Sequence, residues 1–154
     1  MGEIEAKLER MGLKLPTPMK AAGTYEPAIR VGNLVFVSGV GPRKDGALVY
    51  KGKVGRDISM EEGYAAAKLC AVNSLGNIKA IVGDLDQVER IVKVLGFVNA
   101  PEGFEKSPLV INGFSDLLVE LWSERGRHAR SAIGVAALPS NISVEVEMVV
   151  QLKS

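Results

Sequence analysis

An arginine at the head of an apolar segment near the C-terminus is the side chain best suited to do chemistry. In the segment RHARSAIG, strand alternation places Arg130 on the same face as Ala132, Gly134 and Ala136, whose small side chains leave space in front of the guanidinium. A guanidinium is a planar fork of N–H groups that matches a carboxylate, and it stays charged when partly buried. Such a position could hold the carboxylate of a small organic acid.

A second segment, VEVE at 144–147, supplies two carboxylates that could act on such a ligand or pair with the arginine. Exposed ion pairs between Arg and Glu are common and contribute little. Spacing alone favours a structural pair of Arg130 with Glu145 or Glu147, and it leaves the ligand site open as the alternative.

The sequence lacks the residues that nucleophilic, phosphate-binding and metal sites usually require. The chain has one His and one Cys, and it contains neither a phosphate-loop glycine pattern nor a GxSxG nucleophile motif. The lone His128 would need several carboxylates to hold a metal, and the spacing does not supply them. The sequence therefore predicts a site without metal or cofactor.

Composition limits the partners and the compartment. A net charge of +1 gives no global field that would attract nucleic acid or an anionic membrane. The single Cys70 cannot form an intramolecular disulfide, and the charged start MGEIEAKLERMG does not resemble a signal peptide. No stretch approaches the roughly 20 apolar residues of a membrane span. We expect a soluble, cytoplasmic protein that does not bind membranes or nucleic acid.

The elements that must position these residues form one α+β layer. A chain of 154 residues, 47% of them hydrophobic, suffices for a single core. Helices are expected at 2–13, 60–82 and 108–123, with Ser59 and Glu62 forming a capping box before the second. Strands are expected at 25–31, 33–38, 47–54, 88–98, 129–138 and 143–152. The pattern favours a mixed six-stranded sheet with the two longer helices on one face, and an opposite apolar face that oligomerisation would cover.

Five segments, in the same order, resemble those of the Rid family, the YjgF-like imine deaminases. They are GNLVFVSG at 32–39 with GP at 41–42, the helix at 66–80, FVNAPEGF at 97–104, ING at 111–113 and ARSAIGVAALPSNISVEVE at 129–147. The last is the most specific, because it carries the ARS, LP and VEVE elements at matching spacing. The resemblance spans about residues 24–150. It implies a chorismate-mutase-like fold at 21–154, preceded by an extension at 1–20, and a homotrimer with a barrel core and sites at subunit boundaries.

The resemblance also implies roles for individual residues. Arg130 matches the arginine that binds the substrate carboxylate in family deaminases, and Glu145 matches the glutamate that positions or activates water. Tyr25, Ser38 and Asn112 align with pocket residues. Each also has an ordinary structural reading, as a half-buried strand aromatic, a turn hydroxyl and an exposed helix polar residue respectively.

Two further positions concern the shape of the pocket. Gly39 aligns with a residue that lines the same cavity. Ala132 stands where many deaminating members carry Cys, and Gly134 stands where they often carry a larger or acidic residue. The resemblance implies a wider, less polar pocket, with an altered substrate preference.

The leading hypothesis is cofactor-independent hydrolysis of small 2-imino acids to 2-oxo acids and ammonia. Arg130 would orient the carboxylate and Glu145 the water. The alternative is a non-catalytic protein that binds small carboxylates in a regulatory role. Ribonuclease activity, attached to some relatives, is disfavoured by the neutral charge, the few aromatic residues and the single histidine.

Overall fold

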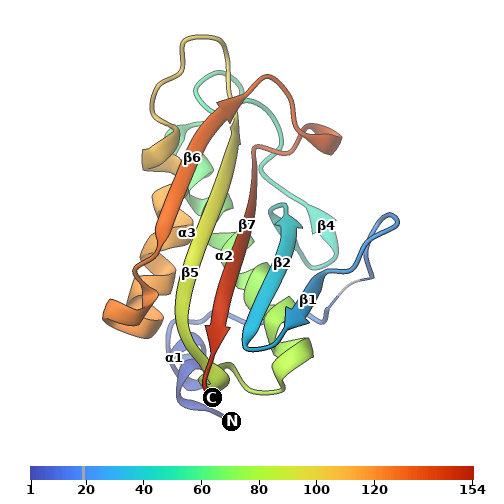
Figure 1. Cartoon of the computed structure of the whole chain (residues 1–154). Coiled ribbons are helices and arrows are strands. Elements are labelled where there is room, and N and C mark those ends of the chain that lie inside the picture. Colours follow the sequence, from blue (N-terminus) through green and yellow to red (C-terminus); the bar gives the residue numbers. More distant parts are fainter. Residues whose placement is uncertain (19) are drawn as a thin grey trace.

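The chain folds around a five-stranded main sheet. In this computed structural model, which describes residues 1–18 and 20–154, the strand order is β1-β2-β7-β5-β6. The strands span Ala28–Val31 (β1), Leu34–Val40 (β2), Val88–Asn99 (β5), Ala129–Val135 (β6) and Val144–Leu152 (β7). Only β5 and β6 run parallel, and the other neighbours are antiparallel. β6, which carries Arg130, is therefore an edge strand (Figure 1).

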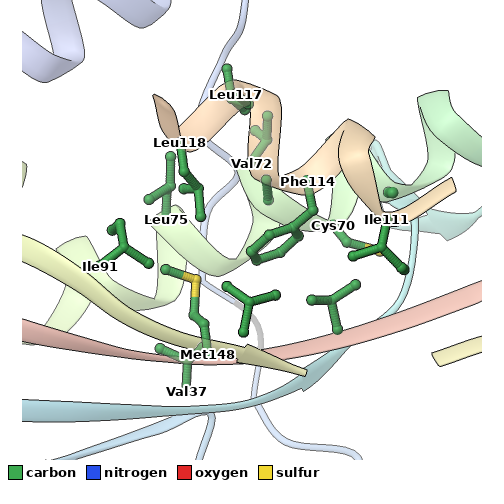
Figure 2. Close-up of a cluster of buried hydrophobic side chains, with 14 of the residues drawn as sticks. Val37, Cys70, Val72, Leu75, Ile91, Ile111, Phe114, Leu117, Leu118 and Met148 are labelled. Carbon is green, nitrogen blue, oxygen red and sulfur yellow. The ribbon is translucent and has the colours of Figure 1, made fainter. Parts of the chain in front are cut away.

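Two long helices cover one face of this sheet. Helices α2 (Met60–Val82) and α3 (Ser107–Trp122) lie side by side behind the strands (Figure 1). The predicted capping box is confirmed, because the Ser59 side chain accepts from the Glu62 amide while the Glu62 side chain accepts from the Ser59 amide. Side chains from both helices, such as Phe114 of α3 and Leu75 of α2, form a buried cluster with Met148 of the sheet (Figure 2). The core thus lies between one helical layer and one sheet.

The predicted sixth strand at 47–54 is wrong. Only Ala47–Leu48 (β4) is extended, and it pairs with Arg43–Lys44 (β3) in a separate two-stranded ribbon. Tyr50 and Gly52 have φ of 54° and 111°, a region that a regular strand cannot accommodate. The chain beyond β4 instead crosses the ends of other strands, where the Gly52 and Val54 amides donate to the carbonyls of Asn141 and Asn99.

The N-terminal helix is shorter than expected and packs on the rest of the domain. Helix α1 spans Glu3–Arg10, and its Ile4 and Leu8 belong to the common core. Asp86 accepts from the Glu3 and Ile4 amides. The extension is therefore built into the same body as the helices and the sheet. None of the helices in the described ranges 1–18 and 20–154 is long and apolar enough to cross a membrane.

The second face of the sheet carries exposed apolar side chains that no other part of residues 1–18 and 20–154 covers. Ile29, Val31, Phe36 and Ile133 are between 46% and 60% exposed. Their strand partners show that they share one side, because Ile29 lies opposite Phe36, and Ile133 lies opposite Phe97. This arrangement agrees with the predicted division into a face covered by helices and an open face. We call the second the open face.

Candidate functional site

Three acceptors from helix α3 hold the Arg130 guanidinium. Nη1 donates to Asn112 Oδ1 at 2.8 Å and to Ser115 Oγ at 3.1 Å, and Nη2 donates to the Pro108 carbonyl at 3.3 Å. Asn112 and Ser115 are three residues apart, so they occupy the same side of the helix. The structure therefore brings together two of the predicted site residues, Arg130 and Asn112. It adds Ser115, which the sequence analysis missed.

The same guanidinium retains donors for a ligand. Nε and one hydrogen of Nη2 have no partner within 1–18 and 20–154, and no carboxylate of that part of the chain forms an ion pair with Arg130. The structural pairing with Glu145 or Glu147, which spacing had favoured, is therefore wrong within this chain. Adjacent N–H groups on one charged fork match the two oxygens of a carboxylate.

Glu145 lies in a different place, against a bulge in strand β2. The β2–β7 register shifts between Val37 and Val40, so Ser38 and Gly39 are accommodated by one residue of the partner strand. A Cβ atom on Gly39 would come within 2.9 Å of Glu145 Oε2. The missing side chain of Gly39 thus provides the space in which this carboxyl group rests.

Burial changes the proton affinity of Glu145. Partial removal from water raises the pKa of its carboxyl group, and the negative charge of Glu147 raises this pKa further. Both residues occupy the open-face side of β7, since the alternate residues Val144, Val146 and Met148 are buried in the core. A carboxyl group with a raised pKa exchanges a proton nearer neutral pH than an ordinary glutamate does.

Tyr25 and Ser38 lie near the same bulge. The Ser38 hydroxyl donates to the Glu26 carbonyl at 2.6 Å, and the Ser38 amide donates to the Pro27 carbonyl at 2.9 Å. Tyr25, directly before these residues, is 52% exposed and lines an open hollow of about 420 Å³. The other lining residues of this hollow are Pro18, Lys20, Ala21, Gly23, Glu26 and Pro27. The Tyr25 loop is thereby fastened to the strand that adjoins Glu145.

The predicted site residues fall into two groups that do not meet within one chain. Arg130 lies opposite Val94, which is fully buried under the helices. Glu145 lies opposite Phe97, which lies opposite the exposed Ile133. The two side chains therefore leave opposite faces of the sheet. We name the set Asn112, Ser115 and Arg130 the arginine half, and the set Tyr25, Ser38, Gly39 and Glu145 the glutamate half.

Comparisons with known proteins identify the family. The profile described as "YjgF/chorismate_mutase-like, putative endoribonuclease" matches residues 5–152. The chain belongs to the YjgF/chorismate mutase-like, or Rid, family. Protein TCP17 of Trypanosoma cruzi is 40% identical over 154 residues, with 99% of this chain and 96% of that protein covered.

Two solved structures place the chain within the Rid family. Protein Atu1372 of Agrobacterium tumefaciens, whose function is unknown, is 42% identical with a TM-score of 0.91, over 97% of this chain and 92% of its own. RidA from an Antarctic Psychrobacter is 27% identical with a TM-score of 0.62, over 88% and 94% of the two chains. The chain is thus similar both to a RidA and, with higher identity, to a relative of unknown function.

The small residues of β6 in this Rid protein admit helix α3 closely. Ala132 packs against the core, and a Cβ atom on Gly134 would lie 3.4 Å from Ser107 Oγ. Ala136, which the sequence pattern added to this row, lies beyond the end of β6. Ala132 and Gly134 therefore face the helix that also carries the acceptors for Arg130.

Proposed function

We propose that this Rid protein hydrolyses small 2-imino acids to 2-oxo acids and ammonia without a cofactor. The observation that carries the proposal is the Arg130 guanidinium, which three neutral acceptors hold in place. Among the residues that the structure describes, none accepts from Nε or from the second Nη2 hydrogen. A 2-imino acid offers a carboxylate for this fork beside an electrophilic carbon. Fixing the substrate in this way supplies orientation, which is a large part of the rate enhancement available to such a reaction.

Glu145 is proposed to handle the protons. Its carboxylate takes a proton from water as the water oxygen bonds to the imine carbon, and that proton then goes to the nitrogen. In the resulting carbinolamine the carboxylate passes the remaining hydroxyl proton to the nitrogen, so the C–N bond breaks, ammonia leaves and the hydroxyl oxygen forms the C=O bond of the 2-oxo acid. The raised pKa of Glu145 suits a group that must accept and return a proton.

We further propose that two subunits of a homotrimer build each site. The arginine half lies on the helix-facing side of an edge strand, and the glutamate half lies on the opposite side of the sheet. A neighbouring copy laid against the open face would bury its exposed apolar side chains. The same contact would bring the glutamate half of one copy to the arginine half of the next.

Replacement of Arg130 tests the activity. We expect Arg130→Ala to lower kcat/KM for 2-imino acids generated in situ by at least about 100-fold, the scale of losing a charged contact to the substrate. Arg127→Ala is the matched control, because Arg127 is an exposed arginine that contacts Glu124 on the surface. Equal rates of Arg130→Ala and the unaltered protein would contradict the proposal. Binding of 2-oxo acids that needs Arg130, without any imine turnover, would instead favour a carboxylate-binding protein.

A further inference from the structure

We propose that His128 is a positioning residue that fixes the Arg130 guanidinium through the hydroxyl of Ser115. The inference rests on the proposed function in one respect, that Arg130 binds the substrate carboxylate. It adds a residue that touches neither the substrate nor the guanidinium. His128 is the only histidine of the chain.

Two hydrogen bonds in series connect Arg130 to His128, and a third joins His128 to the Gly126 carbonyl. Arg130 Nη1 donates to Ser115 Oγ at 3.1 Å. Ser115 Oγ lies 2.9 Å from His128 Nε2, and His128 Nδ1 lies 2.7 Å from the Gly126 carbonyl. Strand alternation places His128 and Arg130, two residues apart, on the same side of the chain. The series therefore runs from Arg130 in β6 through Ser115 in α3 to His128 and Gly126, in the segment that directly precedes β6.

Elementary hydrogen-bond chemistry gives the series a direction. A carbonyl oxygen can only accept, so the Gly126 contact requires a proton on Nδ1. In the neutral ring Nε2 is then an acceptor, and it receives the Ser115 hydroxyl hydrogen. With that hydrogen committed, a lone pair of Ser115 Oγ is left to face Arg130.

The surroundings of His128 favour the uncharged imidazole, which these donor and acceptor roles require. Removal from water lowers the pKa of His128, the Gly126 contact opposes this effect, and the positive charge of Arg130 lowers the pKa further. His128 thus provides an uncharged acceptor next to a permanent cation. This is the state in which the series holds Arg130 without adding a second positive charge.

Without an acceptor at Nε2, the Ser115 hydroxyl hydrogen would form a different hydrogen bond. Serine in a helix readily turns its hydroxyl hydrogen toward the carbonyl four residues earlier, here that of Ile111. That rotation redirects the lone pairs of Ser115 Oγ and weakens the contact with Nη1. The guanidinium would then be held only by Asn112 and Pro108, and its free edge would vary in direction.

Two substitutions of His128 separate positioning from packing. His128→Asn places an amide donor near Nδ1, so it can keep the Gly126 contact, but it has no atom that reaches Ser115. His128→Gln places an amide oxygen near Nε2 and can accept from Ser115. Ser115→Ala removes the middle of the series and serves as the third variant.

We expect His128→Asn and Ser115→Ala to raise KM for a 2-imino acid, and Kd for pyruvate as probe, roughly three- to tenfold, the range for one lost hydrogen bond. The value of kcat should change by less than about twofold, since the loss is in holding the carboxylate. His128→Gln should recover most of the loss. Values for His128→Asn equal to those of the unaltered protein would overturn the inference, and so would equal losses in His128→Asn and His128→Gln.

Nitrogen NMR tests the positioning role of His128 without a measurement of activity. The single histidine gives one unambiguous pair of imidazole signals, which should report the Nδ1–H tautomer at neutral pH. Rotation of the Arg130 guanidinium should become severalfold faster in Ser115→Ala and His128→Asn. An Nε2–H tautomer, or unchanged Arg130 rotation in both variants, would overturn the inference. Failure of the unaltered protein to bind pyruvate or hydrolyse imines would count against the proposed function alone.

Discussion

At the scale of residues, the arginine half and the glutamate half differ in the charge state that their surroundings favour. Arg130 is held by neutral acceptors, so its charge is left for a ligand. Glu145 is held beside Gly39 with Glu147 on the same side of the strand, and both the burial and the like charge favour its protonated form. One half thus presents a cation held by neutral acceptors, and the other presents a carboxyl group with a raised pKa.

The pH dependence of the reaction should follow Glu145. Because its pKa is raised and the proposed mechanism uses the carboxylate, kcat/KM should fall on acidification at a higher pH than for an ordinary glutamate. Glu147→Gln removes one of the two causes and lowers the pKa, so the acid limb of the pH–rate profile should move to lower pH. Glu124→Gln, at an exposed position, should leave the profile in place. An acid limb that stays put or moves upward in Glu147→Gln would contradict this role.

The sequence predicted only part of the arrangement around these residues. Arg130 and Asn112 could be named, and they are in contact. Ser115 was missed because a serine within an apolar helix has no signal of its own, although its three-residue spacing from Asn112 was available. The sequence indicated which side chains of β6 and of β7 share a side of their strand. It did not indicate how the sides of the two strands are matched across the sheet. The placement of Arg130 and Glu145 on opposite faces therefore needed the structure.

At the scale of elements, a close crossing of α2 and α3 determines where the arginine half lies. A Cβ atom on Gly113 would lie 2.1 Å from the Tyr64 carbonyl oxygen and 3.2 Å from Ala67 Cβ. Asn112, which accepts from Arg130, directly precedes this glycine. The approach of the two helices therefore fixes the acceptors of the guanidinium.

Gly113→Ala should disturb both stability and the site. The added methyl group cannot be accommodated without moving α3, so we expect a loss of about 1–3 kcal/mol in the free energy of unfolding, as for other overpacked cores. Carboxylate affinity should fall as well, because Asn112 moves with the helix. Glu120→Ala, on the exposed side of α3, should change stability by less than about 0.5 kcal/mol. Denaturant unfolding measures both, and equal stability of the two variants would contradict the close crossing.

The helices and the central strands were predictable from sequence because their signals are local. The capping box at Ser59, the glycine after Val82 and the alternation of β7 each fix an element within a few residues. The prediction at 47–54 failed because the β-prone residues there are interrupted by Tyr50 and Gly52, whose φ angles are positive. Tertiary contacts with Asn99 and Asn141 impose that path. Propensity alone does not contain these contacts.

At the scale of the whole molecule, the open face and the divided site point to the same assembly. Exposed apolar side chains from three strands, β1, β2 and β6, lie on one side of the sheet. The helices cover the other side (Figure 1). A single chain would expose this surface to water at a cost. A trimer in which the open faces meet would remove that cost and complete the site.

A charge on the open face should dissociate the assembly. Ile133→Glu places a carboxylate among apolar neighbours, so we expect monomers in analytical ultracentrifugation, loss of imine hydrolysis and an unchanged helix content by circular dichroism. Ile81→Glu is the matched control, since Ile81 is a partly exposed isoleucine on the helical layer. It should leave the trimer and the activity in place. A trimer that persists in Ile133→Glu would argue against the open face as the interface.

The most direct test of the shared site is complementation between two inactive variants. Arg130→Ala and Glu145→Gln are co-expressed with different tags, and trimers that carry both tags are purified. Each variant alone should be inactive, whereas every purified mixed trimer should have about one active site in three, because one neighbouring pair supplies both intact halves. Mixed trimers as inactive as either parent would contradict a site that two subunits build together.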